Sequence, residues 1–189
     1  MRVVFKTMLV LAIIAFISYV TIRDFGLPRV PREIHLTYPA VQYTADDPAA
    51  VIHTTLEIEG TYYRYLFHHP TFKGVVRVHE HDFTMLESEI MEYPLYAYDR
   101  IYKASPDVRD SILTSFLSYP IWEHNSRGDF SNFQFKYLGE LFIDNRFEQV
   151  KIHVNREFGD GTDRATYLAA PATTLEEAQQ ILKFTEIFE

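Results

Sequence analysis

The feature that most constrains the fold is a regular alternation of apolar and polar side chains near the C-terminus. In "FQFKYLGELFID", residues 133–144, apolar or aromatic residues alternate with mainly polar ones, and "FEQVKIHV", residues 147–154, repeats the pattern. Side chains of a β-strand point alternately to opposite faces, so each run predicts a strand with one buried face. The short connection Asp144–Arg146 predicts that the two strands pair as a hairpin.

Weaker alternation predicts further strands upstream and one downstream of this hairpin. Gly60 and Gly74 punctuate the upstream runs, as glycine does at turns and close approaches. We expect a first hairpin that turns near Thr71 and Phe72 and returns through "VVRVHEH". The predicted strands are Ile34–Tyr38, "VIHTTLEIEG" from residue 51, "TYYRYLF" from 61, "VVRVHEH" from 75, "LYAYDRIY" from 95 and "RATYLAAP" from 164.

Two segments carry helical signals. In "SPDVRDSILTSFLSYP", Ser105 is a capping residue and apolar residues recur at helical spacing, which predicts a short amphipathic helix that ends before Pro120. In "TTLEEAQQILKFTEI", Thr174 and Glu177 form a capping box. The inward face of this C-terminal helix is predicted to carry Leu175, Ala178, Ile181 and Leu182.

The N-terminal segment indicates a membrane anchor or a signal peptide. Residues 7–22 are uncharged and follow Arg2 and Lys6. These 16 residues span about 24 Å as a helix, and Val3–Phe5 with a snorkelling Lys6 extend the length to about 30 Å. No A-x-A cleavage pattern follows, so an uncleaved signal-anchor is favoured over a cleaved signal peptide.

These patterns divide the chain into three parts. Residues 1–25 are expected to be a single-pass transmembrane helix, and residues 26–50, with four prolines, a juxtamembrane linker. Residues 51–189 are expected to form a soluble α+β domain. The predicted fold class is therefore α+β: an N-terminal transmembrane helix, then an antiparallel β-sheet domain with the C-terminal helix packed on one face.

Charge and composition exclude several classes of function. Residues 33–189 carry 13 basic and 25 acidic side chains, and such a surface repels nucleic acid. The chain has no cysteine, which excludes disulfides, cysteine-based zinc sites and thiol nucleophiles. No phosphate-binding glycine motif occurs, and no cofactor is expected. A short basic tail ahead of the apolar segment favours a location in the cell membrane with the acidic domain on the extracytoplasmic side.

The candidate metal ligands are His79 and His81, in the sequence "VHEH". In a strand these residues share a face, which permits chelation, but two ligands make a weak site. The predicted register places Arg64 opposite His79, and a nearby cation disfavours a bound metal. The alternative, a solvated strand face, is favoured. His68 would lie about 13 Å from His79, so His68 and His69 are not expected to share one metal ion with this pair.

Other chemistry-bearing residues have simpler explanations. Glu87, Glu89 and Glu92 are typical of a solvated acidic stretch, and "GDGTD", residues 159–163, of a turn. Trp122 is a candidate binding aromatic on a loop, although a core position is the more common role of a tryptophan.

Three stretches of the chain resemble a known pattern. They are "LEIEGTYYRYLFHHPTFKGVVRV", "YLGELFIDNRFEQVKIHV" and "YLAAPATTLEEAQQI". Together they resemble a family of uncharacterised small bacterial proteins that are membrane-anchored or secreted. The resemblance covers about half of the chain and implies a location and a fold pattern, without an activity. The predicted helix around Ile112 and the four histidines at 68, 69, 79 and 81 lie outside it.

The expected function is that of a non-enzymatic binding module at the cell envelope. Its partners would be the membrane, through the N-terminal helix, and a protein or envelope component. A sheet face or the segment Tyr119–His124 would make the contact. The alternatives are an envelope enzyme of hydrolase type, whose site is built from dispersed residues, and weak metal binding through His79 and His81.

Overall fold

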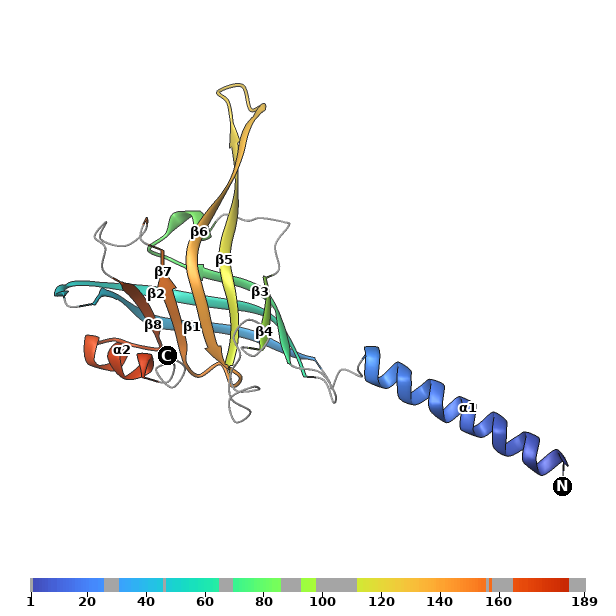
Figure 1. The fold of residues 1–189 in the computed structure, drawn as a ribbon. Coiled ribbons are helices and arrows are strands. Elements are labelled where there is room, and N and C mark those ends of the chain that lie inside the picture. Colours follow the sequence, from blue (N-terminus) through green and yellow to red (C-terminus); the bar gives the residue numbers. More distant parts are fainter. Residues whose placement is uncertain are drawn as a thin grey trace.

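In the computed structural model, eight antiparallel strands of the described chain form a closed barrel, each paired with its neighbours in the sequence (Figure 1). The structure describes residues 2–25, 31–45, 47–64, 70–85, 93–97, 112–155, 157 and 165–183. The strands are β1 (Arg32–Thr44), β2 (Asp47–Tyr63), β3 (Thr71–Val78), β4 (Tyr93–Ala97), β5 (Ile112–His124), β6 (Phe130–Asp144), β7 (Val150–Val154) and β8 (Thr166–Ala170), and the helices are α1 (Arg2–Phe25), the 3₁₀ turn η1 (Asp82–Thr84) and α2 (Leu175–Leu182).

The barrel closes where the first strand meets the last. Val41 of β1 lies opposite Ala169 of β8, and the pairing continues to Thr44 and Thr166. Side chains alternate between the interior and the outer wall. The interior is a continuous apolar core that includes Leu56, Ile58, Phe72, Leu113, Leu141, Ile152 and Leu168, all fully buried.

The predicted fold class is wrong in its architecture. The sheet is closed into a barrel, with α2 packed on the outer wall of β1 and β8 through Ala178 and Ile181. The capping box that begins α2 is confirmed, since the Thr174 side chain accepts a hydrogen bond from the Glu177 amide. Hydrogen bonds from Thr173 to the Glu177 carboxylate lower the pKa of that group.

The predicted transmembrane helix in residues 1–25 is also wrong. Within the described residues, no helix has the length and apolarity that crossing a membrane requires. The charged residues Arg2, Lys6, Arg23 and Asp24 lie inside α1, so its uncharged run is shorter than the helix itself. In Figure 1, α1 lies away from the barrel.

Two further segments differ from expectation. Residues 32–44, within the segment expected to be a linker, form β1 and pair with both β2 and β8. The predicted helix that ends before Pro120 is wrong in its described part, because Ile112–His124 is strand β5. Residues 98–111, which include the predicted cap Ser105, lie outside the described residues.

The late hairpin is confirmed. Residues Gly139–Ile143 of β6 pair with Val150–Val154 of β7 in the antiparallel sense. The connecting turn places Phe147 at a positive φ of 67° and buries its ring against Phe72 and Tyr62. This ring fills one end of the barrel.

Candidate functional site

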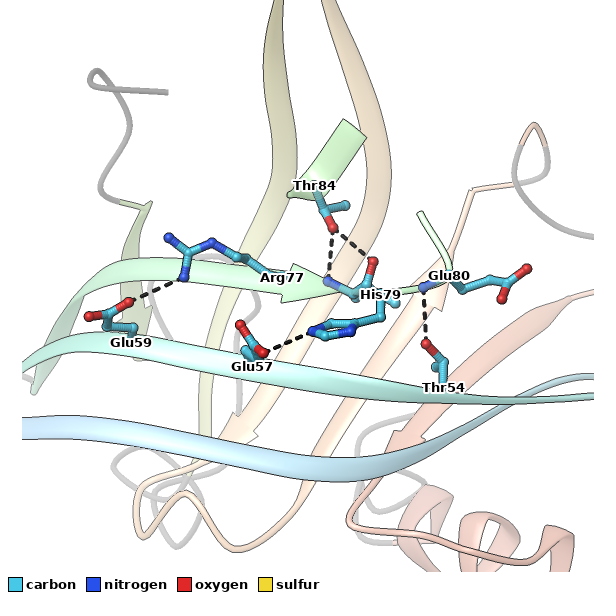
Figure 2. A network of polar contacts seen from close by, with 8 residues as sticks. Thr54, Glu57, Glu59, Arg77, His79, Glu80 and Thr84 are labelled. Atoms are coloured by element: carbon cyan, nitrogen blue, oxygen red, sulfur yellow. Dashed lines mark hydrogen bonds and ion pairs between the residues drawn. The ribbon is translucent and has the colours of Figure 1, made fainter. Parts of the chain in front are cut away.

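The structure places His79 and His81 in different surroundings. His79 follows the end of β3, is exposed, and its Nε2 donates a hydrogen bond of 2.8 Å to the Glu57 carboxylate (Figure 2). His81 is buried, with 8% of its surface exposed, and its Nε2 donates to the Gln42 side-chain oxygen at 3.0 Å. The two imidazoles therefore do not share a strand face.

The register explains this difference. Gly60 of β2 lies opposite Gly74 of β3, so the β2–β3 turn falls before Thr71 and the predicted register is wrong. The His79 amide donates to the Thr55 carbonyl, not to a residue near Arg64. The strand ends at Val78, and the hydroxyl of Thr84 bonds to both the amide and the carbonyl of that residue at 2.9 Å. This turn carries His81 away from the outer wall.

Burial has an electrostatic consequence for His81. Loss of hydration lowers the pKa of His81, and the neighbouring Glu80 carboxylate opposes this shift to a smaller extent. The ring lies 5.8 Å from that of Phe83, which in turn meets Tyr119 of β5 edge-on at 5.5 Å. His81 is thus a packed side chain at the turn after β3, and its surroundings disfavour the charged form.

Ion pairs cover the outer wall near His79. Arg77 binds the Glu59 carboxylate at 3.2 Å, and His35 of β1 lies 3.6 Å from the same carboxylate (Arg77 and Glu59 are drawn in Figure 2). Each acidic group in this row has a basic neighbour on an adjacent strand. Among the residues that the structure describes, no three histidine or carboxylate side chains converge to hold a metal ion.

Several sequence candidates lie outside the described residues. These are His68 and His69, the acidic residues Glu87, Glu89 and Glu92, and the residues of the "GDGTD" turn.

Trp122 has the environment of a surface residue. It lies in β5 opposite Phe133 of β6, and 48% of its surface is exposed. The expectation of a core position is therefore wrong, and the segment Tyr119–His124 is strand, not loop.

The surroundings of Trp122 form an exposed aromatic surface on the β-sheet part of the described chain. Figure 1 shows β5 and β6 extending beyond the barrel as a two-stranded ribbon. Among the described residues, β5 pairs with β4 only at Leu113 and Thr114, whereas its pairing with β6 continues to His124. One face of this ribbon carries six exposed aromatic side chains, which we call the aromatic face: Phe116, Trp122, Phe130, Phe133, Phe135 and Tyr137.

The rings of the aromatic face contact one another. Trp122 lies 4.5 Å from Phe133 and 5.8 Å from Phe130, measured between ring centroids, and Phe133 lies 4.9 Å from Phe135. The interplanar angles of these pairs are 47°, 61° and 79°. Tilted and edge-on pairs of this kind stabilise one another but leave much of each ring uncovered.

The opposite face of the ribbon is polar towards its tip. The Glu123 carboxylate accepts hydrogen bonds from Gln134 at 2.9 Å and from Asn132 at 3.3 Å. At the tip, the Asn125 side-chain oxygen accepts from the amides of Arg127 and Asp129. The ribbon is therefore amphipathic across its two faces, although most of its described residues on both faces are exposed.

The base of the ribbon is held by the barrel. Tyr119 is buried and its hydroxyl donates to the Val76 carbonyl at 2.7 Å. On the same side, the Lys136 ammonium lies 5.4 Å from the centre of the Phe83 ring. These contacts fix the direction in which the aromatic face points.

Sequence reasoning singled out only Trp122 from this surface. The signal that could have found the rest is the aromatic alternation of Phe133, Phe135 and Tyr137, which predicts a strand without showing which of its faces is exposed. No family model, curated protein or solved structure matches the chain. The resemblance to small bacterial envelope proteins and the extracytoplasmic location therefore stay predictions.

Proposed function

We propose that this protein is a non-enzymatic binding module whose contact surface is the aromatic face of the β5–β6 ribbon. The observation that carries the proposal is the exposure of Trp122, Phe130, Phe133 and Phe135 together, at 48%, 57%, 38% and 56%. Isolated exposed apolar residues are common, but a contiguous exposed patch marks an interaction surface.

The composition of the face supports a protein partner. Tryptophan, tyrosine and phenylalanine are enriched in the centres of protein interfaces, where charged residues are depleted. Between the aromatic residues, β5 contributes Ser118 and Pro120 to the same face, so the face is uncharged from Ser118 to Trp122; at its base, the half-buried Glu140 lies opposite Phe116.

The geometry disfavours two other partners. The tip of the ribbon carries the exposed charges Arg127 and Asp129, so insertion of the tip into lipid would bury both at a high free-energy cost. The rings are tilted against one another by 47° or more, and so do not form the flat platform on which a sugar stacks. Tilted rings instead leave grooves that other side chains fill.

The absence of cysteine allows a direct test by thiol labelling. Phe135→Cys places one thiol on the aromatic face, and Gln134→Cys places a matched thiol on the opposite face. Maleimide labelling rates are compared between dilute purified protein and producing cells. We expect the thiol at 135 to be protected in cells by about tenfold or more relative to the thiol at 134. Equal rates for both positions in cells would show that the aromatic face is not covered and would contradict the proposal.

A further inference from the structure

We propose that the partner on the aromatic face is the aromatic face of a second copy of this chain. This inference rests on the proposed function and goes beyond it by naming the occupant. The resulting dimer is symmetric, because a two-fold axis brings the same surface of both copies together.

The area of the face fits this occupant. The six side chains expose between 36% and 57% of their surfaces. With roughly 200 Å² for a complete aromatic side chain, each exposes about 100 Å² and the face about 600 Å². Two copies would bury about 1,200 Å², which is the lower limit of a stable protein–protein interface. A second copy therefore supplies enough apolar surface, and an association in the micromolar range is expected.

The two strands of the ribbon also complement each other in size. On the aromatic face, β6 presents the large residues Phe133, Phe135 and Tyr137. Between Phe116 and Trp122, β5 presents only Ser118 and Pro120.

A two-fold axis along the ribbon would place the large row of each copy on the small row of the other. Phe135 and Pro120 are paired across the ribbon, as are Tyr137 and Ser118. In the dimer, Phe135 of one copy then lies over Pro120 of the second copy, and Tyr137 over Ser118. The pair Trp122 and Phe133 meets its own symmetry mate, which extends the aromatic cluster across the interface.

The charge of the chain sets the salt dependence of this association. Each copy carries a net charge of −8, whereas the aromatic face is uncharged from Ser118 to Trp122 and has Glu140 opposite Phe116 at its base. The repulsion between two acidic chains is screened by salt, and the apolar contact is not weakened by it. Dimerisation of this kind becomes tighter as ionic strength rises, the opposite of an association driven by ion pairs.

Photo-crosslinking of the full chain in producing cells tests the inference. The photoreactive residue p-benzoylphenylalanine replaces Phe135, an aromatic exchange, and a matched variant carries it in place of Gln134 on the polar face. We expect irradiation to give an adduct of twice the chain's mass from position 135 and not from 134, with the crosslink at Ser118–Ile121 of the second copy.

The other outcomes separate this inference from the proposed function. An adduct of any other mass from position 135 would overturn self-association and leave the binding function standing. No adduct from position 135 above the level of position 134 would overturn both. A second variant, Ser118→Glu, places a charge in the small row; the purified variant should sediment as a monomer at concentrations where the wild-type chain is dimeric. An unchanged dimer would also overturn the inference.

Discussion

Trp122 and Phe133 face each other across β5 and β6 with ring centroids 4.5 Å apart, yet neither ring is buried. A cross-strand aromatic pair of this kind contributes about 0.2–1 kcal/mol. We therefore expect Trp122→Ala to lower the free energy of unfolding by about 1 kcal/mol or less, measured by urea denaturation. A loss of 3 kcal/mol or more would show that the aromatic face serves the fold, not a partner.

Phe147 provides the contrasting case of an aromatic residue that serves the fold. Its ring is 1% exposed and packs at 5.3 Å against Phe72, and its carbonyl accepts a 2.7 Å hydrogen bond from the Tyr38 hydroxyl. We expect Phe147→Ala to lower the free energy of unfolding by about 3–5 kcal/mol, because the substitution leaves a cavity at the end of the barrel. Urea denaturation of the Phe147→Ala and Trp122→Ala variants, carried out side by side, measures the loss of unfolding free energy in each. Similar losses for the two variants would contradict the distinction between barrel and ribbon.

The buried histidine predicts a pH dependence of stability. Because burial lowers the pKa of His81 in the folded state, the unfolded chain binds more protons at mildly acidic pH. The contribution of His81 to the free energy of unfolding is fully present above the pKa of about 6.5 in the unfolded chain. It falls as the pH drops from there towards the lower pKa in the folded state. We expect His81→Gln, which stays neutral, to reduce the difference in unfolding free energy between pH 7.5 and pH 5. An undiminished difference in the variant would show that His81 does not titrate in this way.

The close approach of β2 and β3 predicts a steric requirement at Gly74. A Cβ at this position would meet the Phe72 ring and the backbone of β2. Phe72 is fully buried and cannot move aside without disturbing the core. We expect Gly74→Ala to lower the free energy of unfolding by about 1–3 kcal/mol, the usual effect of overpacking. Thermal denaturation of Gly74→Ala is compared with that of Gly128→Ala, in which the added Cβ meets no atom within 4 Å. Any loss of stability in Gly128→Ala arises from the positive φ of 84° at this residue.

The separation of His79 from His81 predicts that the two do not cooperate in binding zinc. A zinc site would add about 2.7 kcal/mol to the free energy of unfolding when the free Zn²⁺ concentration is 100 times its Kd. If Zn²⁺ raises the melting temperature at all, we expect the His79→Ala/His81→Ala variant to show the same rise. The reason is that the two Nε2 atoms already bind Glu57 and Gln42. A shift that the double variant abolishes would restore the two histidines as ligands.

Local patterns predicted several elements well, for reasons that the structure makes clear. Alternation in residues 133–154 is a short-range property, and β6 and β7 pair as it predicts. The capping box of Thr174 and Glu177 is likewise local, and α2 begins there.

The remaining differences have non-local causes. Barrel closure joins Val41 to Ala169, and no local pattern reports such a distant pairing. In β5, Ile112, Leu113, Phe116 and Leu117 fit helical spacing, but pairing with β6 and a register shift after Leu117 make the segment a strand. The aromatic face was missed because alternation shows that a strand has two faces without showing which face the barrel covers.

Trp122 is the single tryptophan of the chain, so its fluorescence reports directly on whether a second copy covers the aromatic face. We would measure its fluorescence emission in the purified full chain from about 0.1 to 100 µM, the range in which an interface of about 1,200 Å² is expected to form. We expect emission typical of a solvated indole at low concentration and a shift to shorter wavelength at high concentration, and we expect this shift to be absent in Ser118→Glu. Emission that stays at the solvated wavelength throughout, or that shifts equally in Ser118→Glu, would contradict self-association through this face.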